Sequence, residues 1–263
     1  MAPDAGRFHR FAPGPPLSAF VDFLWISEGY APPHARERLL PTGTMELVFA
    51  MDGEGRVAAG VAGARSEPLL LDTSCPRSII AAHFRPGGGY PFFGVPSGEL
   101  HNRTVALDVL WGRDAASVRD RLWDAETPAR RFEVLGEALV SRARGRLDGH
   151  PAVRHALRAF EGSTSASPVA DVLQGIGMSP RRFVEVFRAE VGLGPKVFCR
   201  VRRFHEALRR TERLTDVDWA DVAQWCGYYD QAHFNHDFRA FSGLTPSSYL
   251  RRRTARTHVA VVD

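Results

Sequence analysis

The first part of the chain alternates short apolar runs with stretches rich in glycine and proline. Apolar runs of strand length occupy Phe20 to Ile26, Met45 to Met51, Leu69 to Leu71 and Ser78 to Phe84. Glycine and proline clusters fall at residues 13–16, 32–33, 53–55 and 86–89. Short runs bounded by such residues are typical of strands in a β-sandwich or barrel. The pattern therefore predicts a β-rich domain over residues 1–103.

Apolar residues take helical spacing after residue 104. They recur at Val118, Leu122 and Trp123, and then at Phe132, Leu135, Leu139 and Val140. Such spacing is typical of amphipathic helices. We expect a helical region over residues 104–149 that relays signals or mediates dimerisation, although closing the N-terminal core is an equally good role. Flexible joints are expected at residues 145–151 and 162–168.

An internal repeat organises residues 150–253. The segment at residues 170–174, Ala-Asp-Val-Leu-Gln, recurs at residues 220–224 as Ala-Asp-Val-Ala-Gln. Each copy continues with a matching glycine, a pair of phenylalanines four apart, a Gly-Leu dipeptide and a proline. So many matches in one register indicate a duplicated unit.

Each copy is predicted to form a helix, a tight turn and a second helix. Gly177 and Gly227 stand where the first helix ends and the chain turns. Ser179 precedes a proline and Asp230 precedes the second copy's aromatic pair, so both are expected to cap a helix N-terminus. Two short helices around a glycine-containing turn form a helix-turn-helix unit. Residues 195–210, with apolar positions at helical spacing, are expected to form a helix that links the two units.

Residues off the aromatic face of each second helix carry side chains that recognise DNA bases. Arginine bonds guanine, asparagine and glutamine bond adenine, and glutamate accepts from cytosine. For one helix alone a solvated polar face is as good an interpretation, but two copies favour DNA. We expect DNA contacts from Ser179, Arg181, Arg182, Val184, Glu185 and Arg188, and from Gln231, Ala232, His233, Asn235, His236 and Arg239.

The charge distribution supports an anionic partner for the C-terminal part. The chain carries a net charge of +4, but residues 1–150 hold 17 basic and 18 acidic residues, whereas residues 151–263 hold 17 basic and 12 acidic ones. A basic domain is typical of proteins that bind phosphate backbones, although ordinary solvated surface also explains it. The sequence shows no apolar run long enough for a membrane span and no signal peptide, so we expect a cytoplasmic, nucleoid-associated protein. Cys75, Cys199 and Cys226 lack metal-ligand spacing and are expected to be reduced, mostly buried thiols.

The C-terminal pattern resembles the AraC/XylS family of bacterial transcription regulators over residues 152–253. The resemblance is carried by Gly177, Phe183, Phe187, Gly192 and Pro195, and by Gly227, Phe234, Phe238, Gly243, Pro246 and Tyr249. It implies an all-helical domain that binds two adjacent major grooves of double-stranded DNA. Base contacts would fall on Arg181, Val184 and Glu185, and on Gln231, Ala232, His233, Asn235 and His236. Glu185 departs from the basic or neutral residue often found there, which leaves the bases contacted by the first copy in doubt.

The N-terminal part resembles a domain of uncharacterised role that accompanies some AraC-type regulators, with Leu39 to Gly43 and His83 to Gly88 carrying the likeness. In the wider family this domain is often a cupin-like barrel that senses an effector or mediates dimerisation. The fold class expected is therefore α+β: a cupin-like barrel or sandwich, a helical linker, the double helix-turn-helix domain, and a tail over residues 254–263. Partners implied are DNA, a small-molecule effector, RNA polymerase and a second copy of the chain.

Candidate chemistry in the N-terminal part is limited. If an effector pocket exists, Trp25, Glu46, Arg85 and Tyr90 are the expected binding residues; a core tryptophan and a structural Glu46–Arg85 ion pair are the alternatives. His34, His83 and His101 are too scattered for a cupin metal site, so neither a metal nor a cofactor is expected. No nucleophile–base pairing is visible, so we expect a regulator and not an enzyme. A constitutive regulator whose N-terminal domain serves only for dimerisation stays an alternative.

Overall fold

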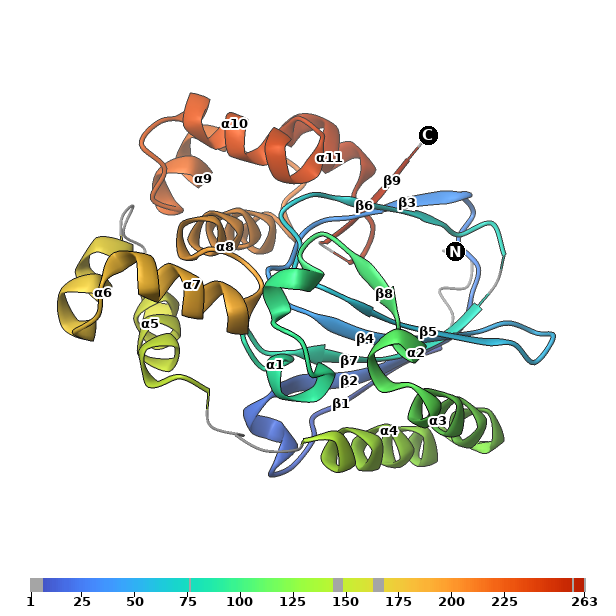
Figure 1. Ribbon diagram of the computed structural model, residues 1–263. Helices are drawn as coiled ribbons and strands as arrows, with labels where there is room; N and C mark the ends of the chain where they lie inside the picture. Colours follow the sequence, from blue (N-terminus) through green and yellow to red (C-terminus); the bar gives the residue numbers. More distant parts are fainter. Residues whose placement is uncertain (1–6, 76, 144–148, 163–167, 257, 263) are drawn as a thin grey trace.

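Two antiparallel sheets form the N-terminal domain in the computed structural model, which describes residues 7–75, 77–143, 149–162, 168–256 and 258–262 (Figure 1). The larger sheet has the order β1-β2-β7-β4-β5-β8 and the smaller one the order β6-β3-β9. The strands are β1 (Arg7–Phe11), β2 (Val21–Tyr30), β3 (Arg36–Leu39), β4 (Glu46–Met51), β5 (Val57–Ala62), β6 (Leu69–Asp72), β7 (Arg77–Phe84), β8 (Thr104–Ala106) and β9 (Val259–Val261). Short helical segments η1 (Leu17–Ala19), α1 (Tyr90–Phe93) and η2 (Ser97–Leu100) connect them. The β-rich domain predicted from the sequence is confirmed.

Side chains alternate between the two faces of the larger sheet. On β4, Leu47, Phe49 and Met51 are buried, while Glu46 and Val48 point to the opposite face. Successive side chains of a strand point to opposite faces, so one face of this sheet packs into the core and the other is free to line a cavity. Apart from Glu46 both faces of β4 are apolar, so the burial of its side chains and not its sequence separates the core face from the cavity face.

Three helices cover the apolar face of the larger sheet: α2 (Leu107–Trp111), α3 (Arg113–Asp124) and α4 (Pro128–Arg142). They are the helical region predicted from the apolar spacing. Leu122 and Leu135 are fully buried in this layer, and the Trp111 Nε1 group donates a hydrogen bond to the Phe92 carbonyl at 3.0 Å. The joints predicted at 145–151 and 162–168 fall largely on residues 144–148 and 163–167, which lie outside the described residues.

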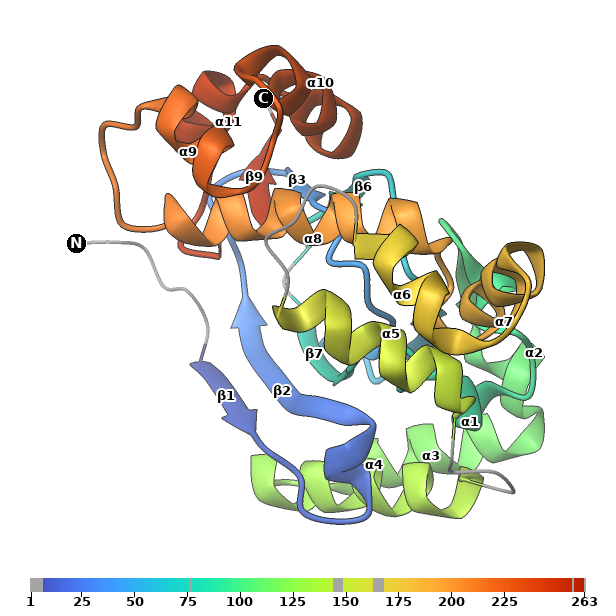
Figure 2. The ribbon, with the colours of Figure 1, turned by 90° about the vertical axis from the view of Figure 1, so that its left-hand side faces the viewer.

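Seven helices follow in the described C-terminal part: α5 (Pro151–Gly162), α6 (Pro168–Ile176), α7 (Pro180–Val191), α8 (Pro195–Arg210), α9 (Trp219–Trp225), α10 (Gln231–Ser242) and α11 (Pro246–Arg252). Helix α8 runs between the two helical units, with α5 to α7 on one side and α9 to α11 on the other (Figure 2). Phe198 on α8 packs against Phe187, and Phe204 on α8 packs against Phe238. The linking helix therefore belongs to the cores of both units, as its apolar spacing predicts.

The two parts of the chain share one apolar core. The buried residues form a single cluster that runs from the sheet into the helical units. Gly87, after β7, lies against Leu157 of α5 and Val191 of α7. Gly192, which ends α7, lies against Ala64 of the N-terminal domain. At both contacts a glycine lets the two parts of the chain approach closely.

The segment after α11 returns to the N-terminal domain. Strand β9 pairs with β3, with Leu39 opposite Val259 and Glu37 opposite Val261. Val259 and Ala260 are buried. Residues 254–263 were expected to be a tail separate from the domains, and the described part of this segment instead forms the edge of the smaller sheet. In the described part of the chain, no helix has both the length and the hydropathy to cross a membrane.

Candidate nucleic-acid interface and N-terminal cavity

The first helix-turn-helix unit consists of α6, a tight turn and α7. Gly177 ends α6 with φ at +66°, a left-handed conformation that glycine adopts without a steric penalty. The Ser179 hydroxyl then accepts a hydrogen bond from the backbone N–H of Arg182 at 3.3 Å and caps α7. Pro180 occupies the first helical position. The predicted cap and turn are confirmed.

Helix α7 has a buried aromatic face and an exposed charged face. Phe183 and Phe187 are fully buried. The side chain of Arg181 is 91% exposed, and that of Arg182 is 66% exposed. The Glu185 carboxylate lies 3.2 Å from Arg181 Nε and 3.5 Å from Arg182 Nη1. The structure therefore brings these three predicted contact residues together, in a cluster where the acid partly neutralises the two cations. Val184 is exposed beside them.

The second unit, α9 to α10, repeats this construction. Gly227 turns the chain with φ at +72°, and the Asp230 carboxylate accepts a hydrogen bond from the His233 N–H at 2.7 Å. Phe234 and Phe238 are fully buried on the inner face of α10. On the outer face Gln231, Ala232, His236 and Arg239 are exposed, and His233 and Asn235 are half-buried. The internal repeat is therefore a repeat in structure as well.

Two of the predicted contact residues lie farther along their helices. Arg188 and Arg239 belong to the last turns of α7 and α10. Arg188 packs close to Gly98 of η2 in the N-terminal domain. The other ten predicted residues lie nearer the helix N-termini. Ser179 caps α7, and the remaining nine lie in the first two turns of α7 or α10.

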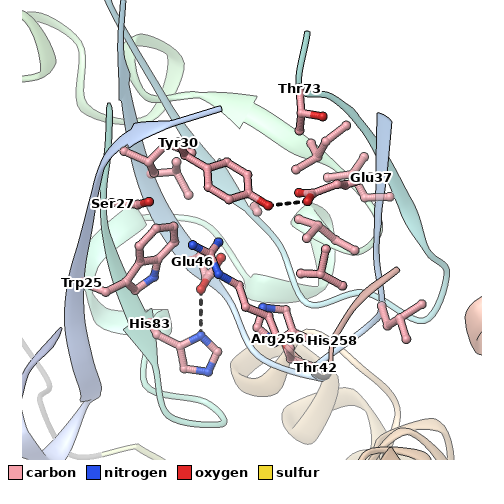
Figure 3. A pocket seen from close by; sticks show the side chains of 18 of the residues that line it. Trp25, Ser27, Tyr30, Glu37, Thr42, Glu46, Thr73, His83, Arg256 and His258 are labelled. Carbon is pink, nitrogen blue, oxygen red and sulfur yellow. Dashed lines mark hydrogen bonds and ion pairs between the residues drawn. The ribbon is translucent and has the colours of Figure 1, made fainter. Parts of the chain in front are cut away.

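A cavity of about 710 Å³ lies between the two sheets of the N-terminal domain (Figure 3). The larger sheet lines it through Trp25, Glu46 and their neighbours, and the smaller sheet through Glu37 and Leu39. Its volume is that of a small-molecule site. Of the four effector residues expected from the sequence, Trp25 and Glu46 line this cavity. Arg85 and Tyr90 do not line it: Arg85 donates to the Ser18 carbonyl at 3.0 Å and pairs with Asp22, and Tyr90 begins α1.

The cavity contains a half-buried carboxylate–imidazole pair. Glu46 Oε1 lies 2.9 Å from His83 Nδ1, and His83 Nε2 lies 3.1 Å from the Thr44 hydroxyl. Burial alone would raise the pKa of the Glu46 carboxyl. The hydrogen bond and charge of His83, with smaller contributions from His258 and Trp25, outweigh burial and hold this pKa below its ordinary value. Glu46 is thus an anion paired with His83, and the Glu46–Arg85 pair offered as an alternative is wrong.

Residues from the C-terminal part complete the wall of the cavity. His205 of α8 and Arg256 and His258 of the last segment line it. Burial lowers the pKa of His205 to about 4, so its ring is neutral, and burial also lowers the pKa of His258. No local pattern marks these residues, because only the tertiary fold brings them to the sheets.

The comparison of the chain with protein-family models gives two matches. Residues 9–106 match a domain of unknown function (DUF6597), and residues 173–252 match a helix-turn-helix domain. The transcriptional activator NphR from Rhodococcus sp. is 35% identical over 88 residues, which is 34% of this chain and 25% of that protein. The C-terminal domain is of the AraC/XylS type. The match spans only a quarter of NphR, so the likeness concerns this domain and not the whole of that activator.

The arrangement of elements is similar to that of ToxT from Vibrio cholerae. One ToxT structure has a TM-score of 0.44 at 10% identity, over 93% of this chain and 97% of that one. A ToxT structure with bound unsaturated fatty acid has a TM-score of 0.41 at 10% identity, over 92% of this chain and 93% of that one. Likeness at this level concerns the arrangement of elements alone.

Charged contacts that fasten the second unit of the AraC-type domain escape sequence reasoning. Asp237 is 1% exposed, and its Oδ1 accepts from Arg200 Nη2 of α8 at 2.6 Å. The hydrogen bond that Arg200 donates to Asp237 raises the pKa of Arg200. Arg203 Nη1 donates to the Gly227 carbonyl at 3.1 Å, with its guanidinium over the ring of Tyr228. Arg203 belongs to the sequence pattern that resembles the AraC/XylS family, but the spacing of the cations on α8 predicts the contacts of neither arginine.

The remaining histidines and the cysteines occupy ordinary positions. His34 lies 2.9 Å from Glu37, and His101 lies 2.9 Å from the Ser66 hydroxyl. Over the described ranges, no three metal-ligating side chains are grouped. Cys226 is buried and Cys199 half-buried, and burial raises the pKa of each thiol to about 11. Cys75 is exposed, so the expectation of buried thiols is wrong for that residue.

Proposed function

We propose that this chain is a transcription regulator that binds specific double-stranded DNA through the N-terminal turns of α7 and α10. The observation that carries the proposal is the pair of matching units with exposed, base-recognising side chains at the start of each second helix. Arg181 of the first unit and Gln231 of the second are both exposed. Helix N-termini also favour the negative charge of phosphates.

Helix α8 supports simultaneous binding by the two units. Because its aromatic side chains belong to both cores, it fixes the distance between α7 and α10. Helices that enter successive major grooves on one face of DNA are about 34 Å apart. A rigid connection removes the entropy cost of ordering a flexible linker, so the second contact follows readily from the first.

The cavity supports control by a small molecule. Strand β3 lies between the cavity and the second unit: Glu37 and Leu39 line the cavity, while Arg38 Nη1 donates to the Ser242 carbonyl at the end of α10, at 2.7 Å. A ligand that shifts β3 would therefore act on the second DNA-binding helix through a single residue. Control requires only that the ligand bind two arrangements of this contact with different affinities.

A second candidate is a constitutive regulator whose N-terminal domain serves only for dimerisation. The exposed apolar side chains of Trp123 on α3 and Val140 on α4 favour it, because a second copy would cover them. Sedimentation of the full chain tests the homodimer. The two candidates differ in whether a cavity ligand changes DNA affinity.

We also propose the cytoplasm as the location and RNA polymerase as a further partner, as expected of an AraC-type regulator.

In vitro selection of binding sites by the full chain, followed by footprinting, tests the proposed function. We expect a preferred sequence with protection over two adjacent major grooves on one face. Affinity should fall steeply with added salt, since each phosphate contact releases bound counterions. No enriched sequence, together with a salt-independent signal, would overturn the proposal.

A further inference from the structure

The segment after α11 packs onto the N-terminal domain and forms a strand of its smaller sheet. We call residues 253–262 the C-terminal strap, described except for residue 257. Its strand β9 pairs with β3, the Leu40 N–H donates to the His258 carbonyl at 2.8 Å, and the Val262 N–H donates to the Arg36 carbonyl at 3.1 Å. The strap thus connects the second helix-turn-helix unit to the strand that lines the cavity.

The strap places a cation inside the cavity. The Arg256 guanidinium lies 4.8 Å from the ring centre of Tyr30 and 5.3 Å from that of Phe8. The side chain reaches from the strap into the cavity, towards the aromatic residues of the larger sheet (Figure 3). Two ring faces attract a cation through their negative potential, most strongly where water is excluded. This part of the cavity is therefore built to hold a positive charge.

Acceptor groups surround the same space. Glu37 is 3% exposed and accepts a hydrogen bond from the Tyr30 hydroxyl. The Glu46 carboxylate lies on the opposite sheet. His205 Nε2 and the Ser27 hydroxyl line the cavity, are shielded from solvent, and have no hydrogen-bond partner in the structure. The neutral His205 ring bonds the Pro41 backbone, which leaves Nε2 as a spare acceptor. Buried acceptors without partners favour a ligand that donates hydrogen bonds.

Other guanidiniums along the lining have partners of their own. Arg10 lies over Phe23 and pairs with Asp22 at 3.8 Å. Arg65 Nε is directed to the Glu67 carbonyl at 3.4 Å. Arg77 lies near the carboxylate of Asp72, whose pKa its charge helps to lower. Among the described residues, the guanidinium that lies over Tyr30 and Phe8 is the one supplied by the strap.

We propose that the cavity binds a ligand with one cationic amine or guanidine group on an apolar body, in the place of the Arg256 guanidinium, and that binding releases the C-terminal strap from β3. This proposal rests on the proposed role of the cavity as an effector site. The apolar walls formed by Val48, Leu69 and Leu71 accommodate the ligand body, and the aromatic rings and carboxylates hold its charged end.

Release of the strap would act directly on the second helix-turn-helix unit, because the strap follows the last helix of that unit. The strap begins at Arg253, directly after α11. Arg253 Nη2 donates a hydrogen bond at 2.6 Å to the carbonyl of Leu214, which lies in the connection between α8 and α9. Its strand β9 also covers β3, whose Arg38 contacts the end of α10. Release of β9 therefore removes the attachment of the second unit to β3 through the strap, and it uncovers the strand whose Arg38 contacts the end of α10.

Calorimetric titration of the full chain with two probes of opposite charge tests the ligand class. We expect 4-phenylbutylamine to bind, and 4-phenylbutanoate, which has a similar body and a negative charge, not to bind. Arg256→Ala removes the internal competitor and should tighten amine binding by about tenfold. Arg213→Ala, an exposed arginine outside the cavity, is the matched control and should change nothing. Equal binding of both probes, or an Arg256→Ala variant with unchanged affinity for the amine, would overturn the proposal.

A second pair of variants tests the aromatic contact. Tyr30→Phe keeps the ring and should retain amine binding, whereas Tyr30→Leu should weaken it by about fivefold or more. Equal affinities in the two variants would exclude the ring contact. Because Tyr30→Leu also alters packing, Arg256→Ala provides the decisive comparison should that variant not fold.

Hydrogen exchange reports the release of the strap. The amides of residues 259–262 should exchange faster in the presence of the amine, and continued protection in an amine-saturated sample would overturn the release. DNA binding is measured on the same samples. A chain that binds its selected DNA but not the amine overturns this inference alone, whereas a chain that binds the amine but no DNA overturns the proposed function.

Discussion

Arg38 of β3 donates from Nη1 to the backbone carbonyl of Ser242, at 2.7 Å, where helix α10 ends. The guanidinium meets the negative end of the helix dipole, a favourable position for a cation. The residues on either side of Arg38 face the cavity or its rim. This one side chain therefore joins the strand that lines the cavity to the end of helix α10.

Replacing Arg38 by alanine should loosen that connection. We expect a loss of about 1–2 kcal/mol in the free energy of unfolding and faster amide exchange after α10, because the Ser242 carbonyl loses its charged donor. Arg36→Ala is the matched control, since Arg36 lies on the same strand with an exposed side chain. Equal effects of the two substitutions would show that the contact stabilises nothing.

Arg181→Ala and Asn235→Ala should each relax the base preference of one unit. The expected cost on the selected site is about 1–3 kcal/mol, with a smaller cost on unrelated DNA. Competition binding against single-base variants of the site measures it. Arg213→Ala serves as the control, because that arginine lies between α8 and α9. A preference unaltered in both variants would show that these side chains do not contact bases.

Phe187→Ala and Phe238→Ala should destabilise the AraC-type domain by about 3–5 kcal/mol each, because both rings are fully buried and leave cavities. Urea denaturation measures the loss. Val184→Ala, on the exposed face of α7, should change stability by less than about 0.5 kcal/mol. A wild-type melting curve for either phenylalanine variant would contradict the shared aromatic core.

Acidification should destabilise the protein through His205. Burial lowers the pKa of His205 from its ordinary 6.5 to about 4 in the folded chain. Between these values the unfolded chain binds a proton that the folded chain does not, so stability falls as pH falls, by up to about 3 kcal/mol. His205→Gln should flatten this dependence, while the exposed-site control His236→Gln should keep it. Parallel pH profiles for the wild type and His205→Gln would refute the buried neutral ring.

The two helix-turn-helix units were predictable because the residues that determine them are close together in sequence and occur twice. The glycine turns, the caps Ser179 and Asp230, and phenylalanines four apart each determine structure within a few residues. Because the same pattern of residues occurs twice in one register, it assigned both segments specifically to helix-turn-helix units. In contrast, Arg200 and Asp237 meet through tertiary packing alone, and neither position carries a periodic signal.

The N-terminal domain was predictable in class but not in detail. Strand β4 lies in the apolar run Met45 to Met51 and was found, whereas β3 has the sequence Arg-Glu-Arg-Leu and resembles a charged loop. Its stability as a strand comes from β6 and β9, the latter more than two hundred residues away. Two of the four effector residues line the cavity because alternation places Trp25 and Glu46 on one face. Arg85 and Tyr90 follow the last residue of β7, where that alternation no longer applies.

The continuous core between the two parts of the chain limits how this regulator can be recombined. Leu157 and Val191 are covered by the turn at Gly87, so a transplant of the helical units alone would expose them to water. A chimaera that joins the helical units to another N-terminal domain would need compensating substitutions along the whole contact between the two parts. The two parts should therefore be exchanged together and not singly.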